Sequence, residues 1–342
     1  MKLLSVAVPC YNSSAYMRKC IELMIEAGGE EIEVIVINDG STDLTLSIAQ
    51  EYERDHPSIV KVIDKENGGH GSGVNAGLAA ATGIYFRVCD SDDYLEPNAL
   101  KTLLNSMRAA ITKGNEPDVY FTNYVYDHQY DNTTRVNSLA HNFPQDRIFT
   151  WDEIKPFRLT EYMLMHSMTF KTSVLRACGL HLPEHTFYVD EIYCYQPLPY
   201  AKKLCYLNLD LYWYFIGRPD QSVTVENMKK RYRMQLTVVK EMFRAYTYED
   251  LRGLPKKLRK YMVHLLRVMT AVAMAYVYMD KGKERVADYR AFRKEVKEMN
   301  PSLSKVIFHR AYMPFLRSIP PRLSATVYPI GYRFFARKLK LG

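Results

Sequence analysis

The first 130 residues alternate between strand-like and helix-like patterns, and this alternation restricts the fold of the chain more than any other feature. Apolar runs rich in β-branched and aromatic residues predict strands, and the amphipathic stretches between them predict helices. The expected strands cover residues 3–8, 32–37, 59–63, 84–89 and 119–126, and the expected helices cover residues 14–26, 43–55, 71–81 and 97–112. Such alternation favours an α/β fold with a mainly parallel sheet and helices on both faces.

Polar residues follow four successive expected strands. They occupy positions 11–12, 38–41, 67–69 and 90–93. The carboxyl ends of parallel strands meet at one edge of a sheet, and α/β proteins bind their ligands there. We therefore predict one binding site at that edge rather than four unrelated solvated loops.

The last of these segments carries three carboxylates, Asp90, Asp92 and Asp93. Carboxylates crowded at the end of a buried strand repel one another unless a cation or hydrogen-bond donors compensate them. Mg²⁺ and Mn²⁺ prefer oxygen ligands, and Mg²⁺ is often held by one or two carboxylates together with substrate phosphates. The alternative is a solvated acidic turn in which Asp92 or Asp93 caps a helix that starts near residues 94–98.

The composition is that of a globular protein larger than one ordinary domain. Of the 342 residues, 47% are hydrophobic and 25% are charged, so the chain can bury a sizeable core. The six cysteines form no C-x-x-C pair, which fits reduced thiols in the cytosol. The N-terminal segment has too short an apolar run for a signal peptide. We therefore expect a cytoplasmic protein.

The net charge of +8 comes from the C-terminal segment. Residues 301–342 contain eight Lys or Arg and no Asp or Glu, and removing these eight from the 46 basic residues leaves 38, which equals the number of acidic residues. Seven Phe and Tyr residues are interleaved with these charges. Such a segment can lie on an anionic membrane surface, pack structurally or bind nucleic acid. We expect the membrane surface, and nucleic acid is the alternative that we favour least.

We expect no membrane-spanning helix. Residues 261–279 come closest to an apolar span but contain His264 and Arg267, whereas a spanning helix needs about 20 predominantly apolar residues. Residues 130–225 mix loops with short strands near 204–207 and 211–215, and the pattern becomes helical over 226–245, 256–278 and 283–298.

Four motifs resemble those of the family 2 glycosyltransferases, which have a GT-A fold. They lie at residues 5–12, 34–43, 67–77 and 90–93, in the order and spacing of the family. The resemblance implies an inverting, metal-dependent hexosyl- or N-acetylhexosaminyl-transferase of the bacterial cell-envelope or polysaccharide type. It also implies a catalytic domain over 1–224, with a donor-binding half (1–130) and an acceptor-side half (131–224). A helical region (225–300) and a basic aromatic tail (301–342) follow.

The resemblance also implies a nucleotide-sugar donor, expected to be UDP-linked, and assigns its contacts to named positions. The base lies against Pro9 and Tyr11, and Asp39 accepts from the uracil imide or the ribose, although Asp39 in Asn-Asp-Gly-Ser can also be a plain turn residue. Arg218 offers a phosphate fork, with a surface arginine as its alternative. The full implied donor set is Pro9, Tyr11, Asn12, Asp39, Asn67, Gly71, Asp90, Arg218, Gln221 and Ser222.

By the same resemblance, Asp92 is the metal ligand and Asp90 is a second candidate ligand, with Mn²⁺ and Mg²⁺ both open. The catalytic base is Asp190, which deprotonates the acceptor hydroxyl. The family commonly has Glu before this Asp, whereas this chain has Val189. Glu191 is therefore a rival base, and Asp190 can alternatively be only a helix cap.

Two histidines stay open between functional and packing roles. His70 can contact the donor or pack within its loop, and His166 can line the acceptor cleft or belong to the core.

The implied partners are a nucleotide-sugar donor and a glycan or lipid-linked acceptor at the inner face of a membrane. One rival function is a sugar-nucleotide pyrophosphorylase, but that class has a Gly-rich basic loop after the first strand, where this chain has residues 9–12 in the order Pro-Cys-Tyr-Asn. The other rival is a catalytically impaired nucleotide-sugar-binding assembly partner.

Overall fold

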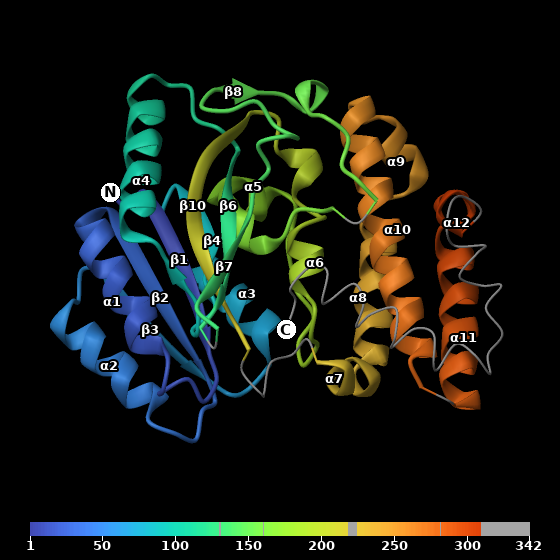
Figure 1. The fold of residues 1–342 in the computed structure, drawn as a ribbon, viewed down its shortest axis with the longest axis horizontal. Helices are drawn as coiled ribbons and strands as arrows, with labels where there is room; N and C mark the ends of the chain where they lie inside the picture. The colour runs from blue at the N-terminus through green and yellow to red at the C-terminus, as the bar shows by residue number, and fades with distance from the viewer. Residues whose placement is uncertain (130, 160, 218–223, 281, 309–342) are drawn as a thin grey trace. The chain divides into compact units, whose positions relative to one another are not determined.

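The computed structural model describes residues 1–342 except 130, 160, 218–223, 281 and 309–342. Its described strands form one ten-stranded sheet in the order β3-β2-β1-β4-β9-β6-β10-β5, with β7 beside β6 and β8 beside β10 (Figure 1). The strands are β1 (Leu4–Cys10), β2 (Ile32–Asp39), β3 (Val60–Lys65), β4 (Tyr85–Val88), β5 (Tyr94–Leu95), β6 (Val119–His128), β7 (Thr133–Asn137), β8 (Ile148–Phe149), β9 (Met168–Lys171) and β10 (Leu204–Ile216).

Strands β1 to β4 are parallel, and their register brings their carboxyl ends to one edge. Cys10 at the end of β1 is opposite Asn38, and Asp39 at the end of β2 is opposite Lys65. On the other side of β1, Ala7 is opposite Val88 of β4. The loops that follow these four strands therefore begin next to one another, as the sequence predicts.

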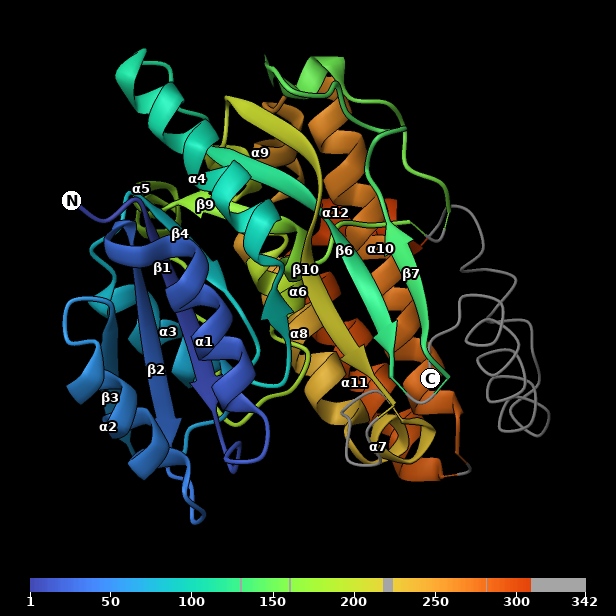
Figure 2. The same cartoon turned by 60° about the vertical axis from the view of Figure 1, so that its left-hand side comes forward.

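Helices cover both faces of the parallel strands. Figures 1 and 2 show α1 and α2 on one face of β1–β3 and α3 on the other, so the expected α/β fold is confirmed. The described helices are α1 (Met17–Gly28), α2 (Thr45–Asp55), α3 (His70–Ala80), α4 (Pro97–Thr112), α5 (Thr172–Ala177), α6 (Asp190–Tyr193), α7 (Val225–Lys230), α8 (Tyr232–Ala245), α9 (Tyr248–Arg252), α10 (Lys256–Tyr278), α11 (Lys283–Met299) and α12 (Pro301–Phe308).

The second half of the sheet is mixed. Strand β9 is antiparallel to both β4 and β6, and the short sequence patterns did not predict it. Strand β10 is continuous, whereas the sequence predicts two short strands, because the polar residues Asn208 and Asp210 interrupt the apolar pattern. Both accept hydrogen bonds from Nδ2 of Asn123, at 2.9 and 2.8 Å, so the sheet continues through them.

The start of α4 argues against the alternative in which Asp92 or Asp93 caps it, while the expected range of 97–112 is confirmed. Residues Tyr94–Leu95 form β5, which pairs with β10, and the helix begins at Pro97. Its cap is Glu96, whose carboxylate accepts a hydrogen bond from the Ala99 amide at 2.7 Å. The acidic turn is therefore separated from the helix.

The chain divides into two compact units. The first contains Met1–Lys155 and Met163–Phe215, and the second contains Pro156–Tyr162 and the chain from Ile216 onward. In the second unit α8 packs against α10 and α11, and α11 packs against α12. Phe308 of α12 stacks on Phe243 of α8, with ring centroids 6.2 Å apart. The first residues of the basic aromatic segment thus pack structurally, while 309–342 lie outside the described residues.

Among the described helices, α10 alone is long and apolar enough to cross a membrane by length and composition. Of its most apolar 18-residue window, 61% is buried inside the structure. A buried core helix meets the same criteria, so this is weak support for a span. The six cysteines are all free and buried.

A substitution at Gly77 can test the close packing of α3 against β1. A Cβ atom at this position would lie 2.6 Å from Cβ of Ala7, which is fixed in the sheet. We expect Gly77→Ala to lower the free energy of unfolding by about 1–2 kcal/mol, because overpacking outweighs the gain in helix propensity. Ala79→Ser adds one atom on the exposed side of the same helix and should change it by less than about 0.5 kcal/mol. Equal urea midpoints for the two variants would contradict this packing argument.

Candidate functional site

A pocket of about 420 Å³ lies at the carboxyl ends of β1, β2 and β3. Tyr11 is 56% exposed, so its ring is available to a ligand. The lining residues are Pro9, Cys10, Tyr11, Asp39, Asn67, Gly69, His70, His185, Thr186 and Phe187. Four residues of the predicted donor set thus share one pocket.

Asp39 fixes the loop that forms the floor of this pocket. Its side chain is only 3% exposed, and Oδ1 accepts hydrogen bonds from Nζ of Lys65 at 2.8 Å and from the Gly68 amide at 2.9 Å. Oδ2 accepts from the Gly69 amide at 2.7 Å, and Nδ2 of Asn67 donates to the Asp39 carbonyl at 2.8 Å. A carboxylate has about four acceptor positions, so one is left for a ligand.

Asn12 joins the loops that follow β1 and β2. Its Oδ1 accepts a hydrogen bond from the Thr42 amide at 2.9 Å, and its own amide donates to Oγ of Ser41 at 3.0 Å. Asn12 has φ 50, in the left-handed region that Asn tolerates better than most residues. Its contacts in the structure are thus to protein, and it is not among the residues that line the pocket.

His70 links the pocket to the acidic turn. Its Nε2 lies 2.9 Å from Oδ1 of Asp90. Burial alone would lower the pKa of His70, but the hydrogen bond to Asp90 and the negative charges of Asp90, Asp190 and Asp39 raise it. Burial likewise opposes ionisation of Asp90, yet the contact with His70 lowers the pKa of that carboxyl. The two side chains therefore stabilise each other as an ion pair.

Asp190 opens α6 and lies within the electrostatic influence of this pair. Burial raises its pKa, and the negative charge of Asp90 adds to the effect, whereas His70 opposes it. A carboxylate with a raised pKa is a better proton acceptor near neutral pH than an ordinary aspartate. Asp190 thus has the chemistry of a general base.

The loop before α6 is held against α3. Asn75 Nδ2 donates to the Leu182 carbonyl and Oδ1 accepts from the Leu182 amide, both at 2.9 Å, and the His185 amide donates to the Gly68 carbonyl at 2.6 Å. Val189 is 1% exposed, and its Cγ2 would lie 3.4 Å from a Cβ at Gly71. A glutamate at position 189 would therefore bury a carboxylate in this apolar contact.

Gly71 is required by packing. A Cβ there would meet the Pro183 carbonyl oxygen at 2.6 Å. Gly71 is buried and is not among the residues that line the pocket.

Asp93 belongs to the fold rather than to the pocket. It is 1% exposed, and its carboxylate accepts hydrogen bonds from the Tyr212 hydroxyl at 2.5 Å and from the Phe215 amide at 2.8 Å. Burial and the negative charges of Asp92 and Asp90 raise its pKa well above the usual range. Asp92, by contrast, is partly exposed.

His166 lies in the aromatic core behind the acidic turn. It is stacked between Tyr212 and Tyr214, with ring centroids 4.5 and 4.9 Å away. Burial lowers the pKa of His166 to about 4, and the charge of Arg87 contributes to that shift. Arg87 is fully buried and donates to Oγ1 of Thr169 at 2.7 Å. The structure therefore supports the packing interpretation of His166.

Metal ligands would come from the acidic turn. Among the residues that the structure describes, no group of three or more His, Cys, Asp or Glu could hold a metal ion by itself. Asp92 is partly exposed, and His70 occupies Oδ1 of Asp90, which leaves Oδ2. Two carboxylates suit a hard divalent ion that takes its remaining ligands from substrate phosphates and water.

Several predicted residues are not part of this geometry. Arg218, Gln221 and Ser222 lie outside the described residues. Conversely, the residues 185–187 that line the pocket had no sequence signal, because they belong to an irregular loop in which His185 has φ 48. For His70 the sequence left two roles open, contact with the donor or packing within its loop.

A family comparison identifies the chain. The glycosyl transferase family 2 model matches residues 5–176, about half of the sequence, and these residues include the four motifs that line the sheet edge. The chain belongs to glycosyltransferase family 2.

Curated members of family 2 are similar over part of their length. Chondroitin synthase from Escherichia coli is 33% identical over 178 residues, which are 52% of this chain and 23% of the synthase. Glycosyltransferase GlyA from Streptococcus pneumoniae serotype 4 is 30% identical over 236 residues, which are 64% of this chain and 31% of GlyA. The chain thus spans less than a third of either relative.

Solved structures share the fold. TarS 1–349 from S. aureus, in complex with UDP-GlcNAc, matches with a TM-score of 0.66 at 19% identity, over 96% of this chain and 89% of that one. The mannosyltransferase PcManGT from Pyrobaculum calidifontis, in complex with GDP-Man and Mn²⁺, matches with a TM-score of 0.53 at 15% identity, over 95% and 86%. The expected GT-A fold of family 2 is confirmed.

Asp39 gives a test of the loop geometry. Asp39→Asn replaces one acceptor oxygen by a donor that faces an amide, so we expect the free energy of unfolding to fall by about 2–4 kcal/mol. Asp64→Asn on the next strand is a matched control, because Asp64 is exposed and accepts one bond from Asn38, and it should change stability by less than about 0.5 kcal/mol. Urea unfolding measures both. A stability of Asp39→Asn equal to that of the control would show that the carboxylate does not hold the loop.

Proposed function

We propose that this family 2 member is an inverting, metal-dependent glycosyltransferase that moves a hexosyl or N-acetylhexosaminyl group from a UDP-linked donor to an acceptor hydroxyl. The observation that carries the proposal is His70, which lines the pocket and whose Nε2 lies 2.9 Å from Oδ1 of Asp90, with the charge of Asp190 also acting on its pKa. In the proposal, Asp190 is the proton acceptor, and Asp90 and Asp92 belong to the diphosphate and metal site.

The donor pocket supports a nucleotide. The exposed ring of Tyr11 and the ring of Pro9 offer stacking surfaces, and Asp39 keeps one acceptor position for the uracil imide or the ribose. The pocket volume of about 420 Å³ is within the usual range for small-ligand sites. The UDP and UDP-GlcNAc complexes of TarS agree with a UDP donor.

In the proposed reaction, Asp190 accepts the proton of the acceptor hydroxyl while that oxygen attacks the anomeric carbon. The bond from this carbon to the diphosphate oxygen breaks, its electron pair leaves with UDP, and the configuration inverts. Asp92, with Asp90 as a second ligand, would hold Mn²⁺ or Mg²⁺, which supplies positive charge to the leaving diphosphate. His70 keeps Asp90 ionised and oriented.

The names of the relatives support polysaccharide synthesis as the setting, since chondroitin synthase makes a glycan polymer. We propose a cell-envelope or exopolysaccharide glycan, free or lipid-linked, as the acceptor. That the enzyme acts at the inner face of a membrane, with residues 301–342 on the membrane surface, stays a prediction.

Asp190→Asn should reduce sugar transfer by about a thousandfold while UDP still binds, because the variant lacks the proton acceptor but keeps the donor pocket. Glu191→Gln is the matched control, and it should keep most of the activity. UDP release from a panel of UDP-sugars, in the presence of Mn²⁺ and an acceptor, measures the rate and identifies the donor. Full activity of Asp190→Asn, or loss confined to Glu191→Gln, would move the base to Glu191.

The pH profile of the wild-type enzyme should reflect the same residue. The base works ionised, and burial raises the pKa of Asp190, so kcat/KM should rise with pH through a pKa above that of an ordinary aspartate. An acid limb at or below that value would contradict Asp190 as the titrating base.

Asp92→Asn should weaken UDP binding at least tenfold when Mn²⁺ is present. Loss of an outer-shell partner of a metal already lowers metal affinity by about tenfold or more, and a direct ligand should matter at least as much. With EDTA added, wild type and variant should bind UDP equally, because the difference lies in the metal. Calorimetry with Asp64→Asn as control checks this. A variant whose affinity still responds fully to Mn²⁺ would exclude Asp92 as the ligand.

A further inference from the structure

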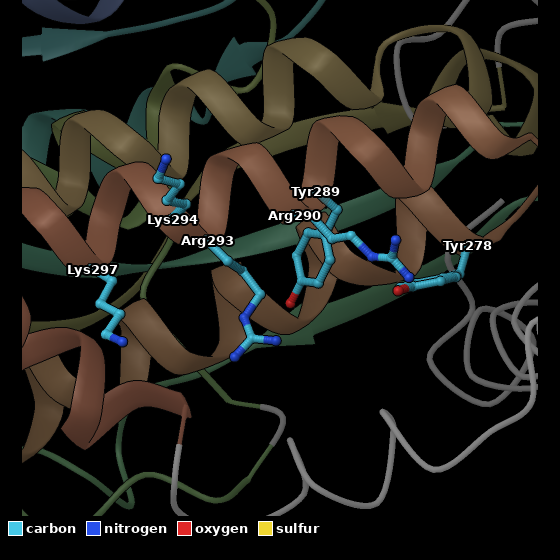
Figure 3. Close-up of a pocket in the computed structure, with 6 residues that line it drawn as sticks. All are labelled: Tyr278, Tyr289, Arg290, Arg293, Lys294 and Lys297. Atoms are coloured by element: carbon cyan, nitrogen blue, oxygen red, sulfur yellow. The ribbon is translucent and has the colours of Figure 1, made fainter.

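Helix α11 carries a row of cations on one side. Arg290, Arg293, Lys294 and Lys297 follow the spacing i, i+3, i+4, i+7, so they extend along one stripe of the helix. Together with Tyr278 and Tyr289 they line a pocket of about 490 Å³ (Figure 3). We call these six residues the α11 basic face. None of them belongs to the proposed donor site.

Three of the four acidic residues of α11 pair with α8 rather than with this face. Glu284 and Asp288 pair with Arg233 of α8, and Glu295 pairs with Lys240 of α8 at 3.2 Å. The remaining acidic residue, Glu298, forms a long contact with Lys294, in which Oε1 and Nζ are 3.9 Å apart. Among the described residues that line this pocket there is no Asp or Glu, so the contact of Glu298 with Lys294 offsets only part of the positive charge.

Three cations of this face keep unused hydrogen-bond donors. In the part of the chain that the structure describes, Arg290, Arg293 and Lys297 have no carboxylate within ion-pair distance. The guanidinium of Arg293 lies 4.8 Å from the ring centroid of Phe308. Its Nε is buried and has no hydrogen-bond partner among the described residues. Figure 3 shows the guanidinium of Arg290 beside the Tyr278 and Tyr289 rings, with Arg293 and Lys297 extending to the same side of the helix.

This arrangement suits phosphate groups spread over a surface. The row from Arg290 to Lys297 is about 10 Å long by helix rise, more than a single phosphate spans. Tyr289 is buried, but Tyr278 is partly exposed, and tyrosine is favoured where apolar and aqueous layers meet. The next residues in the sequence, 301–342, add eight basic residues and no acidic ones. We propose that the α11 basic face binds the phosphate headgroups of anionic lipids and so holds the enzyme on a membrane surface.

The test is the partition of the full chain onto vesicles of phosphatidylcholine with phosphatidylglycerol, compared with phosphatidylcholine alone. Each basic side chain near an anionic surface raises partition about fivefold. The triple variant Arg290→Gln/Arg293→Gln/Lys297→Gln should therefore partition about 100-fold less than wild type. The double variant Arg290→Lys/Arg293→Lys keeps the positive charges of the face and should bind the vesicles as wild type does. Where the triple variant fails to fold, Arg290→Gln/Lys297→Gln, which spares Arg293 and its contact with Phe308, should lose about 25-fold.

The matched control removes the same charge elsewhere. Lys61→Gln/Lys101→Gln/Lys113→Gln changes three exposed lysines of the first unit and should partition within about twofold of wild type. An equal loss of vesicle partition in the two triple variants would mean that only net charge matters, and it would overturn the proposal. Unchanged partition in both triple variants would overturn it as well. Binding of inorganic diphosphate or polyphosphate at the basic face without vesicle binding would also overturn it, in favour of a soluble phosphate ligand. The assay needs no donor sugar, so its outcome is independent of the proposed glycosyl transfer.

Discussion

The carboxylate of Asp39 is the point on which the site geometry depends. Its hydrogen bonds to Lys65 and to the Gly68 and Gly69 amides fix the loop between β3 and α3. That loop sets the position of His70 at the start of α3, and the Gly68 carbonyl receives the His185 amide. One buried charge at a strand end thus fixes the loop that contributes Asn67, Gly69 and His70 to the pocket and, through the Gly68 carbonyl, contacts the loop that precedes α6.

The acidic residues around this edge are compensated in different ways, and the differences separate their roles. Asp39 is satisfied by amides and a lysine, Asp90 by His70, and Asp93 by Tyr212 and the Phe215 amide. Burial and the charge of Asp90 disfavour ionisation of both Asp93 and Asp190, but the Asp93 carboxylate is taken up by its bonds to Tyr212 and the Phe215 amide. Environment rather than residue type therefore distinguishes a positioning carboxylate from a proton acceptor.

The sequence was sufficient to predict those site residues that directly follow strands. Buried parallel strands produce long apolar runs, so the ends of β1 to β4 could be located, and with them Pro9, Tyr11, Asp39 and Asn67. The contribution of residues 185–187 could not be predicted, because tertiary hydrogen bonds from Asn75 set that loop. The structural role of Asp93 was hidden for the same reason, since its partners lie more than a hundred positions away on β10.

The interaction between Asp90 and Asp190 has a consequence for the order of substrate addition. The negative charge of Asp90 raises the pKa of Asp190, so any positive charge brought to Asp90 lowers it and increases the ionised fraction of Asp190. A filled donor side would therefore prepare the acceptor side for proton transfer, whereas an empty one leaves Asp190 more protonated. Val189 adds no charge of its own before Asp190, so the charge at Asp90 acts on Asp190 directly through electrostatics and is opposed by His70.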